Sequence, residues 1–210
     1  MTIKIVRLSM ANEGDIVCVD IFVEQGENSE RNRFKLLCSQ YAGLRLKRGE
    51  ISRQTYEEIE EASRICDAYI RGLNILSFGS NTARTLELKL RRRGFDSSVA
   101  GAAIELLRTK GYLNENEDIV RELERCLRKL WGKSRIIAHL HQRGYEEEAI
   151  FEAEEMLSEI DFASRCLEKL YSCCDDLPGD IKERQKLIAS LCRYGYSMSD
   201  IRYAFAHFDA

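Results

Sequence analysis

A glycine-centred tripeptide occurs three times in this 210-residue chain, and its regular spacing limits the possible folds more than any other pattern in the sequence. The three copies are Arg93-Gly94-Phe95, Arg143-Gly144-Tyr145 and Tyr194-Gly195-Tyr196, and their spacings are 50 and 51 residues. Each copy ends one apolar helical pattern and precedes another. A glycine at a helix C-terminus can take a positive φ, and an apolar residue beside it can fold back onto the last turn. The sequence therefore predicts three helix ends of one kind.

Apolar residues on both sides of the glycine also align between the copies. Their separations of three and four residues are those of a buried helix face. The aligned positions are Leu86, Ile136 and Leu187; Leu90, Leu140 and Leu191; Ala100, Ile150 and Ile201; Ala103, Ala153 and Ala204; and Leu107, Leu157 and Phe208. One more helix precedes each aligned pair, at about 62–76, 117–131 and 161–173. This pattern predicts a mainly α fold, an elongated tandem array of three three-helix repeats at 61–114, 115–160 and 161–210.

Residues 1–60 have a different pattern. β-branched and aromatic residues at 3–5 and 16–23 lie on either side of the turn-forming segment Asn12-Glu13-Gly14-Asp15. A short helical pattern begins at Phe34 and stops near Gly43, residues 44–50 form a connector, and a helix is expected from Ser52 to Cys66. We therefore expect a small N-terminal β-hairpin/α extension ahead of the repeats.

The apolar residues are not arranged for a membrane. No stretch approaches the roughly 18 consecutive apolar residues that cross a bilayer, and the N-terminus lacks the apolar core of a signal peptide. We expect a cytoplasmic protein without membrane contact. We also expect a monomer, because a tandem array completes its core within one chain.

The eight cysteines are scattered along the chain without any C-x-x-C pair, which favours reduced thiols that pack as small apolar side chains. A redox switch formed by the adjacent Cys173 and Cys174 is one alternative, although a polar loop is the simpler interpretation of this segment. His139 and His141 are two residues apart and point in different directions on a helix, and no cysteine lies at zinc-ligand spacing beside them. We expect neither a metal nor another cofactor.

Motifs of catalysis are also missing from the sequence. It contains no phosphate-binding glycine-rich loop, no H-E-x-x-H, no G-x-S-x-G, and no histidine placed to activate a cysteine. Its many acidic residues are as frequent as expected for helix faces exposed to water, so their number does not indicate a catalytic site. We do not expect an enzyme.

Charge is unevenly distributed along the chain. Residues 84–143 carry 14 basic and 8 acidic side chains, a net charge of +6, whereas residues 144–210 carry 7 and 15, a net charge of −8. The basic region suits phosphate or an acidic partner, although any one of its residues fits a solvated helix face equally well. The candidate partner-binding residues are Arg84, Lys89, Arg91, Arg92 and Arg93 in one cluster and Arg125, Arg128, Lys129, Lys133 and Arg135 in another.

Residues 60–210 resemble one family. Thr85 to Phe95, followed by Ala103-Ile104-Glu105-Leu106-Leu107 and Gly111-Tyr112-Leu113-Asn114-Glu115, is similar to the first repeat of RecX regulatory proteins. Trp131-Gly132-Lys133-Ser134-Arg135-Ile136, with Leu140 and Arg143-Gly144-Tyr145, resembles the second. The third repeat fits more loosely, since Tyr194 replaces a basic residue. Two further departures are Glu117-Asp118-Ile119, which lacks the family's aromatic residue, and a net charge of −3 where members are often basic.

The resemblance implies a regulator in homologous recombination, DNA repair and the SOS response. RecX proteins bind in the groove of the RecA recombinase filament on single-stranded DNA, and they modulate, mainly inhibit, its ATPase, strand-exchange and co-protease activities. The acidic C-terminal third weakens the expectation of binding to free DNA. One alternative is a helical nucleic-acid-binding module or transcriptional regulator. Another is a scaffold whose N-terminal strands offer an edge to a partner.

Overall fold

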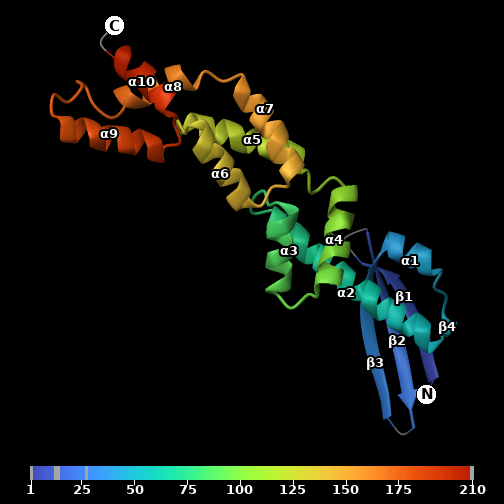
Figure 1. The fold of residues 1–210 in the computed structure, drawn as a ribbon. Coiled ribbons are helices and arrows are strands. Elements are labelled where there is room, and N and C mark those ends of the chain that lie inside the picture. The colour runs from blue at the N-terminus through green and yellow to red at the C-terminus, as the bar shows by residue number, and fades with distance from the viewer. Residues whose placement is uncertain (1, 12–14, 27, 209–210) are drawn as a thin grey trace. The chain divides into compact units, whose positions relative to one another are not determined.

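The computed structural model describes residues 2–11, 15–26 and 28–208, and in these ranges the chain forms ten helices and four strands (Figure 1). The chain divides into two compact units. Unit 1 is Met1–Asn81 with Leu86–Leu113, and unit 2 is Thr82–Thr85 with Asn114–Ala210. The predicted mainly α fold with an N-terminal β extension is confirmed. No helix in the described ranges is long and apolar enough to cross a bilayer.

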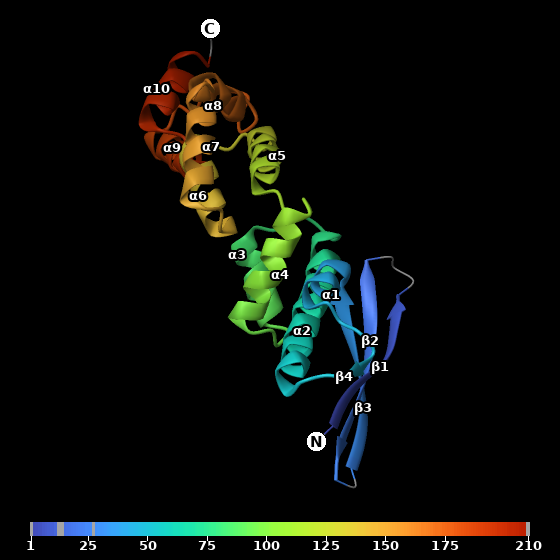
Figure 2. The same cartoon turned by 90° about the vertical axis from the view of Figure 1, so that its right-hand side faces the viewer.

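Unit 1 begins with an antiparallel sheet of four strands in the order β3-β2-β1-β4. The strands are β1 (Thr2–Met10), β2 (Ile16–Gln25), β3 (Asn28–Leu37) and β4 (Gly49–Glu50). The helices α1 (Cys38–Leu44) and α2 (Arg53–Leu76) complete this part, and Figure 2 shows α2 along one side of the sheet. Alternate residues of the long strands pack with Ile59 of α2 in one core, namely Ile3, Ile5, Val17, Val19, Ile21 and Leu36.

The N-terminal β segment, predicted as a β-hairpin or small sheet, is a sheet of four strands, whereas two helix predictions were wrong. Residues 34–37 were predicted to begin a helix but end β3, where Leu36 pairs with Val17 and Phe34 with Val19. The helices predicted at 52–66 and 62–76 are one helix, α2, because its buried face continues through both segments. The expected boundary between residues 60 and 61 therefore falls inside α2. The predicted turn at 12–14 lies outside the described residues.

The sheet face opposite α2 holds a buried carboxylate. Asp20 is 2% exposed and accepts a hydrogen bond from Arg33 Nε at 2.6 Å and another from Arg31 at 3.3 Å. The hydrogen bond from Arg33 outweighs the effect of burial and lowers the pKa of Asp20 below its usual 3.8. Asp20 thus pairs with two guanidinium groups on the neighbouring strand.

We expect Asp20→Asn to destabilise the sheet at neutral pH but not in strong acid. A carboxyl whose pKa is lowered by folding stabilises the folded state above its unfolded pKa, and this contribution is lost as pH falls through the folded pKa. Hydrogen exchange of β2 amides in urea, at neutral pH and at about pH 2, measures the difference. If the native protein and Asp20→Asn differed in stability by the same amount at both pH values, the role assigned to the Asp20 carboxylate would be contradicted.

Eight helices follow the sheet and α2. They are α3 (Ala83–Arg91), α4 (Ser97–Thr109), α5 (Glu115–Arg128), α6 (Lys133–Arg143), α7 (Glu147–Ser158), α8 (Phe162–Tyr171), α9 (Ile181–Arg193) and α10 (Met198–Ala206). In unit 1, α4 packs on α2. In unit 2, α5 to α10 share one apolar core. Every aligned apolar position is buried except Leu187, which is half-buried on α9. The division into three repeats remains a prediction.

The three glycine-ended helices have the predicted geometry. Gly94, Gly144 and Gly195 have φ values of 90°, 80° and 94°. The amide of the following aromatic residue donates to the carbonyl five residues back at 3.4, 3.3 and 3.2 Å, respectively. This is the long hydrogen bond of a Schellman-type helix end.

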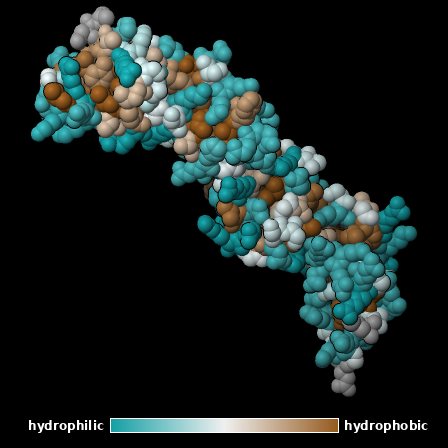
Figure 3. Space-filling view, viewed as in Figure 1, coloured by the Kyte–Doolittle hydropathy of each residue, from teal (hydrophilic) through white to brown (hydrophobic). Residues whose placement is uncertain are grey.

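On the face drawn in Figure 3, hydrophilic residues predominate and hydrophobic ones show in small separate areas. Three of the eight cysteines, Cys66, Cys126 and Cys166, are buried.

Candidate functional site

The first predicted basic cluster lies on α3 and the turn that follows it. Its five residues are all exposed. Lys89 donates to Asn81, and Arg93 donates to the Lys89 carbonyl at 3.0 Å, so these two residues hold the end of the helix. Arg91 and Arg92 line a shallow pocket with Phe95 and Asp96. Asp96 is paired with Arg64, and neither Arg91 nor Arg92 has a carboxylate partner among the described residues. Arg84 lies at the other end of α3, in the segment that belongs to unit 2.

Two of the five residues in the second predicted cluster form ion pairs within their own helix. Arg125 pairs with Glu122 at 3.0 Å, and Arg128 lies 4.0 Å from Glu124, each about one turn away on α5. Lys133 is exposed at the start of α6 and lines a pocket that also contains Asp161 and Asp200. Arg125 and Arg128 are therefore less available to an anionic partner than the sequence predicted.

The remaining two residues, Lys129 and Arg135, join a group that we call the cation–aromatic cluster: Lys129, Trp131, Arg135, Lys169 and Tyr194. The Arg135 guanidinium lies 4.2 Å from the centre of the Trp131 ring and 5.1 Å from that of Tyr194. Lys129 Nζ is 5.0 Å from the Trp131 ring, and Lys169 Nζ is 4.3 Å from the Tyr194 ring. Cations and rings thus alternate across α5, α6, α8 and α9.

Backbone contacts fix this cluster. The turn after α5 is left-handed at Leu130, with a φ of 53°, and places Trp131 beside α6. The Gly132 amide donates to the Tyr194 carbonyl at 2.8 Å, and the Ser134 amide donates to the Gly195 carbonyl at 3.2 Å. The Tyr196 hydroxyl donates to the Leu130 carbonyl at 2.8 Å. The loop before α6 and the loop after α9 are therefore bound together.

The cluster has the chemistry of an anion-binding surface. None of Lys129, Arg135 and Lys169 is paired with a carboxylate in the described part of the chain. Trp131 and Tyr194 are half-buried, so part of each ring remains accessible. Cations bind phosphate, and aromatic rings can stack with bases, which together bind single-stranded nucleic acid. The sequence prediction missed Trp131, Lys169 and Tyr194. Of these three residues, the sequence singled out only Tyr194, because it stands where the family usually has a basic residue.

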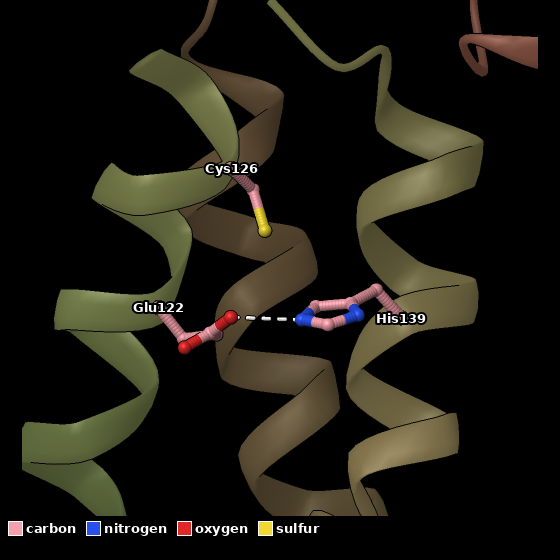
Figure 4. Close-up of side chains that lie close together, drawn as sticks. All are labelled: Glu122, Cys126 and His139. Atoms are coloured by element: carbon pink, nitrogen blue, oxygen red, sulfur yellow. Dashed lines mark hydrogen bonds and ion pairs between the residues drawn. The ribbon is translucent and has the colours of Figure 1, made fainter. Parts of the chain in front are cut away.

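A second group of polar side chains lies in the core of unit 2. Glu122 and Cys126 are one turn apart on α5 and face His139 of α6 (Figure 4). His139 Nε2 and Glu122 Oε1 are 2.8 Å apart and hydrogen-bonded. Burial opposes the ionisation of Glu122, but the hydrogen bond with His139 and the charge of Arg143 lower its pKa overall. Burial raises the pKa of Cys126 to about 11. The sequence did not reveal this group, because His139 lies on a different helix from Glu122 and Cys126 and meets them only when α5 packs on α6.

Comparisons with known proteins identify a shared fold. No protein-family model and no curated protein sequence matches the chain. The crystal structure of regulatory protein RecX superposes with a TM-score of 0.74 and 19% identity, over 99% of this chain and 98% of that one. The crystal structure of RecX from Lactobacillus salivarius superposes with a TM-score of 0.58 and 21% identity, over 70% of this chain and 98% of that one. The chain therefore has the fold of these regulatory proteins.

Proposed function

We propose that this chain is a RecX-type regulator that binds the RecA filament on single-stranded DNA and mainly inhibits its activities. The observation that carries the proposal is the likeness to regulatory protein RecX over 99% of the chain. The resemblance of residues 60–210 to RecX repeats supports it independently of the structure. In this proposal the protein acts in the cytoplasm as a monomer, and its action on the filament requires no catalysis, cofactor or membrane.

The charge distribution supports a mechanism of steric and electrostatic binding. The exposed Arg91 and Arg92 and the cation–aromatic cluster offer unpaired cations to phosphate or to acidic side chains. The acidic helix α7 offers the opposite charge, with Glu147 and Glu148 in its first turn. A filament of protein and DNA presents both signs of charge, so it can bind both kinds of surface.

The test is ATP hydrolysis by a RecA protein on single-stranded DNA, with this chain added below stoichiometry. We expect the native chain to inhibit hydrolysis. We expect a variant with Arg91, Arg92 and Arg93 changed to alanine to inhibit more weakly, because cations near phosphate contribute affinity that falls with salt. The variant should remain folded, since these three side chains are exposed and the lost hydrogen bond from Arg93 to the Lys89 carbonyl affects only the last turn of α3.

A matched control changes Lys182, Arg184 and Lys186 on α9 to alanine and removes the same charge from another exposed helix. This control should inhibit nearly as well as the native chain. No inhibition by the native chain, or equal losses in both variants, would contradict the proposal.

A second candidate is a module that binds nucleic acid directly, and the cation–aromatic cluster favours it. Fluorescence anisotropy with a labelled single strand, with no recombinase present, separates the two functions. Tight binding to the bare strand together with no effect on hydrolysis would select the second function.

A further inference from the structure

The buried group of Glu122, Cys126 and His139 has a composition that helix packing alone does not require. Glu122 is 4% exposed and Cys126 is 1% exposed, and both lie among the apolar residues of unit 2. The donor atoms of the three side chains all lie within 4.8 Å of one another. Figure 4 shows the thiol, the carboxylate and the imidazole directed into the space between α5 and α6. A carboxylate, a thiol and an imidazole are three of the common ligands of zinc in proteins.

We propose that Glu122, Cys126 and His139 form a binding site for a divalent transition metal of the zinc class. Glu122 Oε1, Cys126 Sγ and His139 Nε2 are its three protein ligands, and water occupies the fourth position. This proposal is independent of the proposed function.

The distances require only a small adjustment. In a tetrahedral zinc site with bonds of about 2.0 to 2.3 Å, neighbouring donor atoms lie about 3.3 to 3.7 Å apart. His139 Nε2 and Glu122 Oε1, now 2.8 Å apart, would separate slightly and exchange their hydrogen bond for two metal bonds. Cys126 Sγ lies within 4.8 Å of the other two donor atoms, and side-chain rotation can bring it closer to the metal position.

The charges and neighbours of the site determine its selectivity. One carboxylate and one thiolate balance the charge of a divalent ion. Arg125 binds the other oxygen of Glu122 at 3.0 Å and would orient the carboxylate from outside the site. Magnesium and calcium prefer oxygen ligands, so a thiol and an imidazole select zinc, cobalt or cadmium over them.

Cobalt(II) provides the direct test, because a cobalt–thiolate bond gives a charge-transfer absorption band. We expect full-length reduced protein to develop this band with one Co²⁺ per chain and to lose it when Zn²⁺ is added. Trp131 is the single tryptophan, and its ring lies 5.2 Å from that of His139 in an edge-on arrangement. Bound Co²⁺ should therefore also quench the tryptophan fluorescence.

Four variants identify the ligands. Cys126→Ser should abolish the band, and His139→Gln should weaken Co²⁺ binding more than about tenfold. Cys166→Ser removes an equally buried thiol from the same core and should keep the band. The double variant Cys173→Ser/Cys174→Ser removes the adjacent thiols and should also keep it.

Each contrary outcome overturns the proposal. Absence of a band in the native chain with excess Co²⁺ excludes the site, and the Glu122–His139 hydrogen bond then serves packing alone. A band that persists in Cys126→Ser but disappears in the double variant assigns the metal to Cys173 and Cys174. Circular dichroism checks the fold of every variant. If Cys126→Ser does not fold, His139→Gln decides, because its amide can still hydrogen-bond to Glu122.

Discussion

Replacing Gly195 with alanine should be among the most destabilising single changes in unit 2. Gly195 has a φ of +94°, and a Cβ atom there would lie 2.4 Å from the backbone nitrogen of Arg135. The left-handed conformation alone costs about 1 to 2 kcal/mol for a residue with a side chain. Displacement of the α6 backbone adds to this, so we expect a loss of about 3 kcal/mol or more in the free energy of unfolding. Urea denaturation followed by Trp131 fluorescence measures it.

Gly94 provides a matched control for the conformational cost. It ends α3 as Gly195 ends α9, with a φ of +90°, but a Cβ atom there would have nothing within 4 Å. Gly94→Ala should therefore cost about 1 to 2 kcal/mol in the unfolding of unit 1, which circular dichroism in urea measures because Trp131 lies in unit 2. Gly132→Ala tests the contact without the strain, because Gly132 has a φ of −77° and its Cβ would lie 2.3 Å from the Gly195 carbonyl. Equal losses of stability in Gly94→Ala and Gly195→Ala would show that the close contact of Gly195 with Arg135 adds nothing to the cost of the substitution.

The sequence predicted the three helix ends but not this difference between them. The positive φ of Gly94, Gly144 and Gly195 follows from local pattern, because the end of an apolar helix face next to a glycine is a local signal. The contact between Gly132 and Gly195 joins two loops far apart in the sequence. Such a contact depends on how the helices of unit 2 pack, and no spacing in the sequence reports it.

The third strand was missed because it lies at the edge of the sheet. Its first eight residues, Asn28 to Lys35, include none that is fully buried, and only Leu36 and Leu37 are. Period-two alternation is clear in a strand with one buried face, and it fades where both faces are polar. The local pattern near Phe34 then resembled the start of a helix. Residues 34–37 form part of a strand instead, because β3 pairs with β2 along its whole length.

Some features of the candidate site were within reach of sequence reasoning. Glu122 with Arg125 and Glu124 with Arg128 have the spacings of helical ion pairs, so their mutual pairing could have been predicted. The position of Arg135 between two rings could not, because Trp131 and Tyr194 come from different loops. Charge counts locate a basic region, but only tertiary packing shows which cations remain unpaired.

Under the proposed function, changing Lys129 and Lys169 together to alanine should weaken binding to the RecA filament about tenfold, which corresponds to about 1.4 kcal/mol. These lysines lie at the two ends of the cation–aromatic cluster, and their loss leaves Arg135 between its two rings. If each contacts one phosphate of a single strand, the slope of log affinity against log salt should fall by about 1.4. Anisotropy of labelled chain titrated with filament at several salt concentrations measures both quantities.

The control for this experiment is Lys182→Ala/Lys186→Ala, which removes the same charge from an exposed face of α9. Neither of these lysines contacts an aromatic ring among the described residues. Long-range attraction would weaken in both double variants alike, because it depends on net charge and is screened over about 8 to 10 Å. Only a direct contact predicts a larger loss for Lys129 and Lys169. Equal losses would therefore show that the cation–aromatic cluster acts only through long-range electrostatic attraction. The helix α3 would then remain the better candidate for direct contact with the filament.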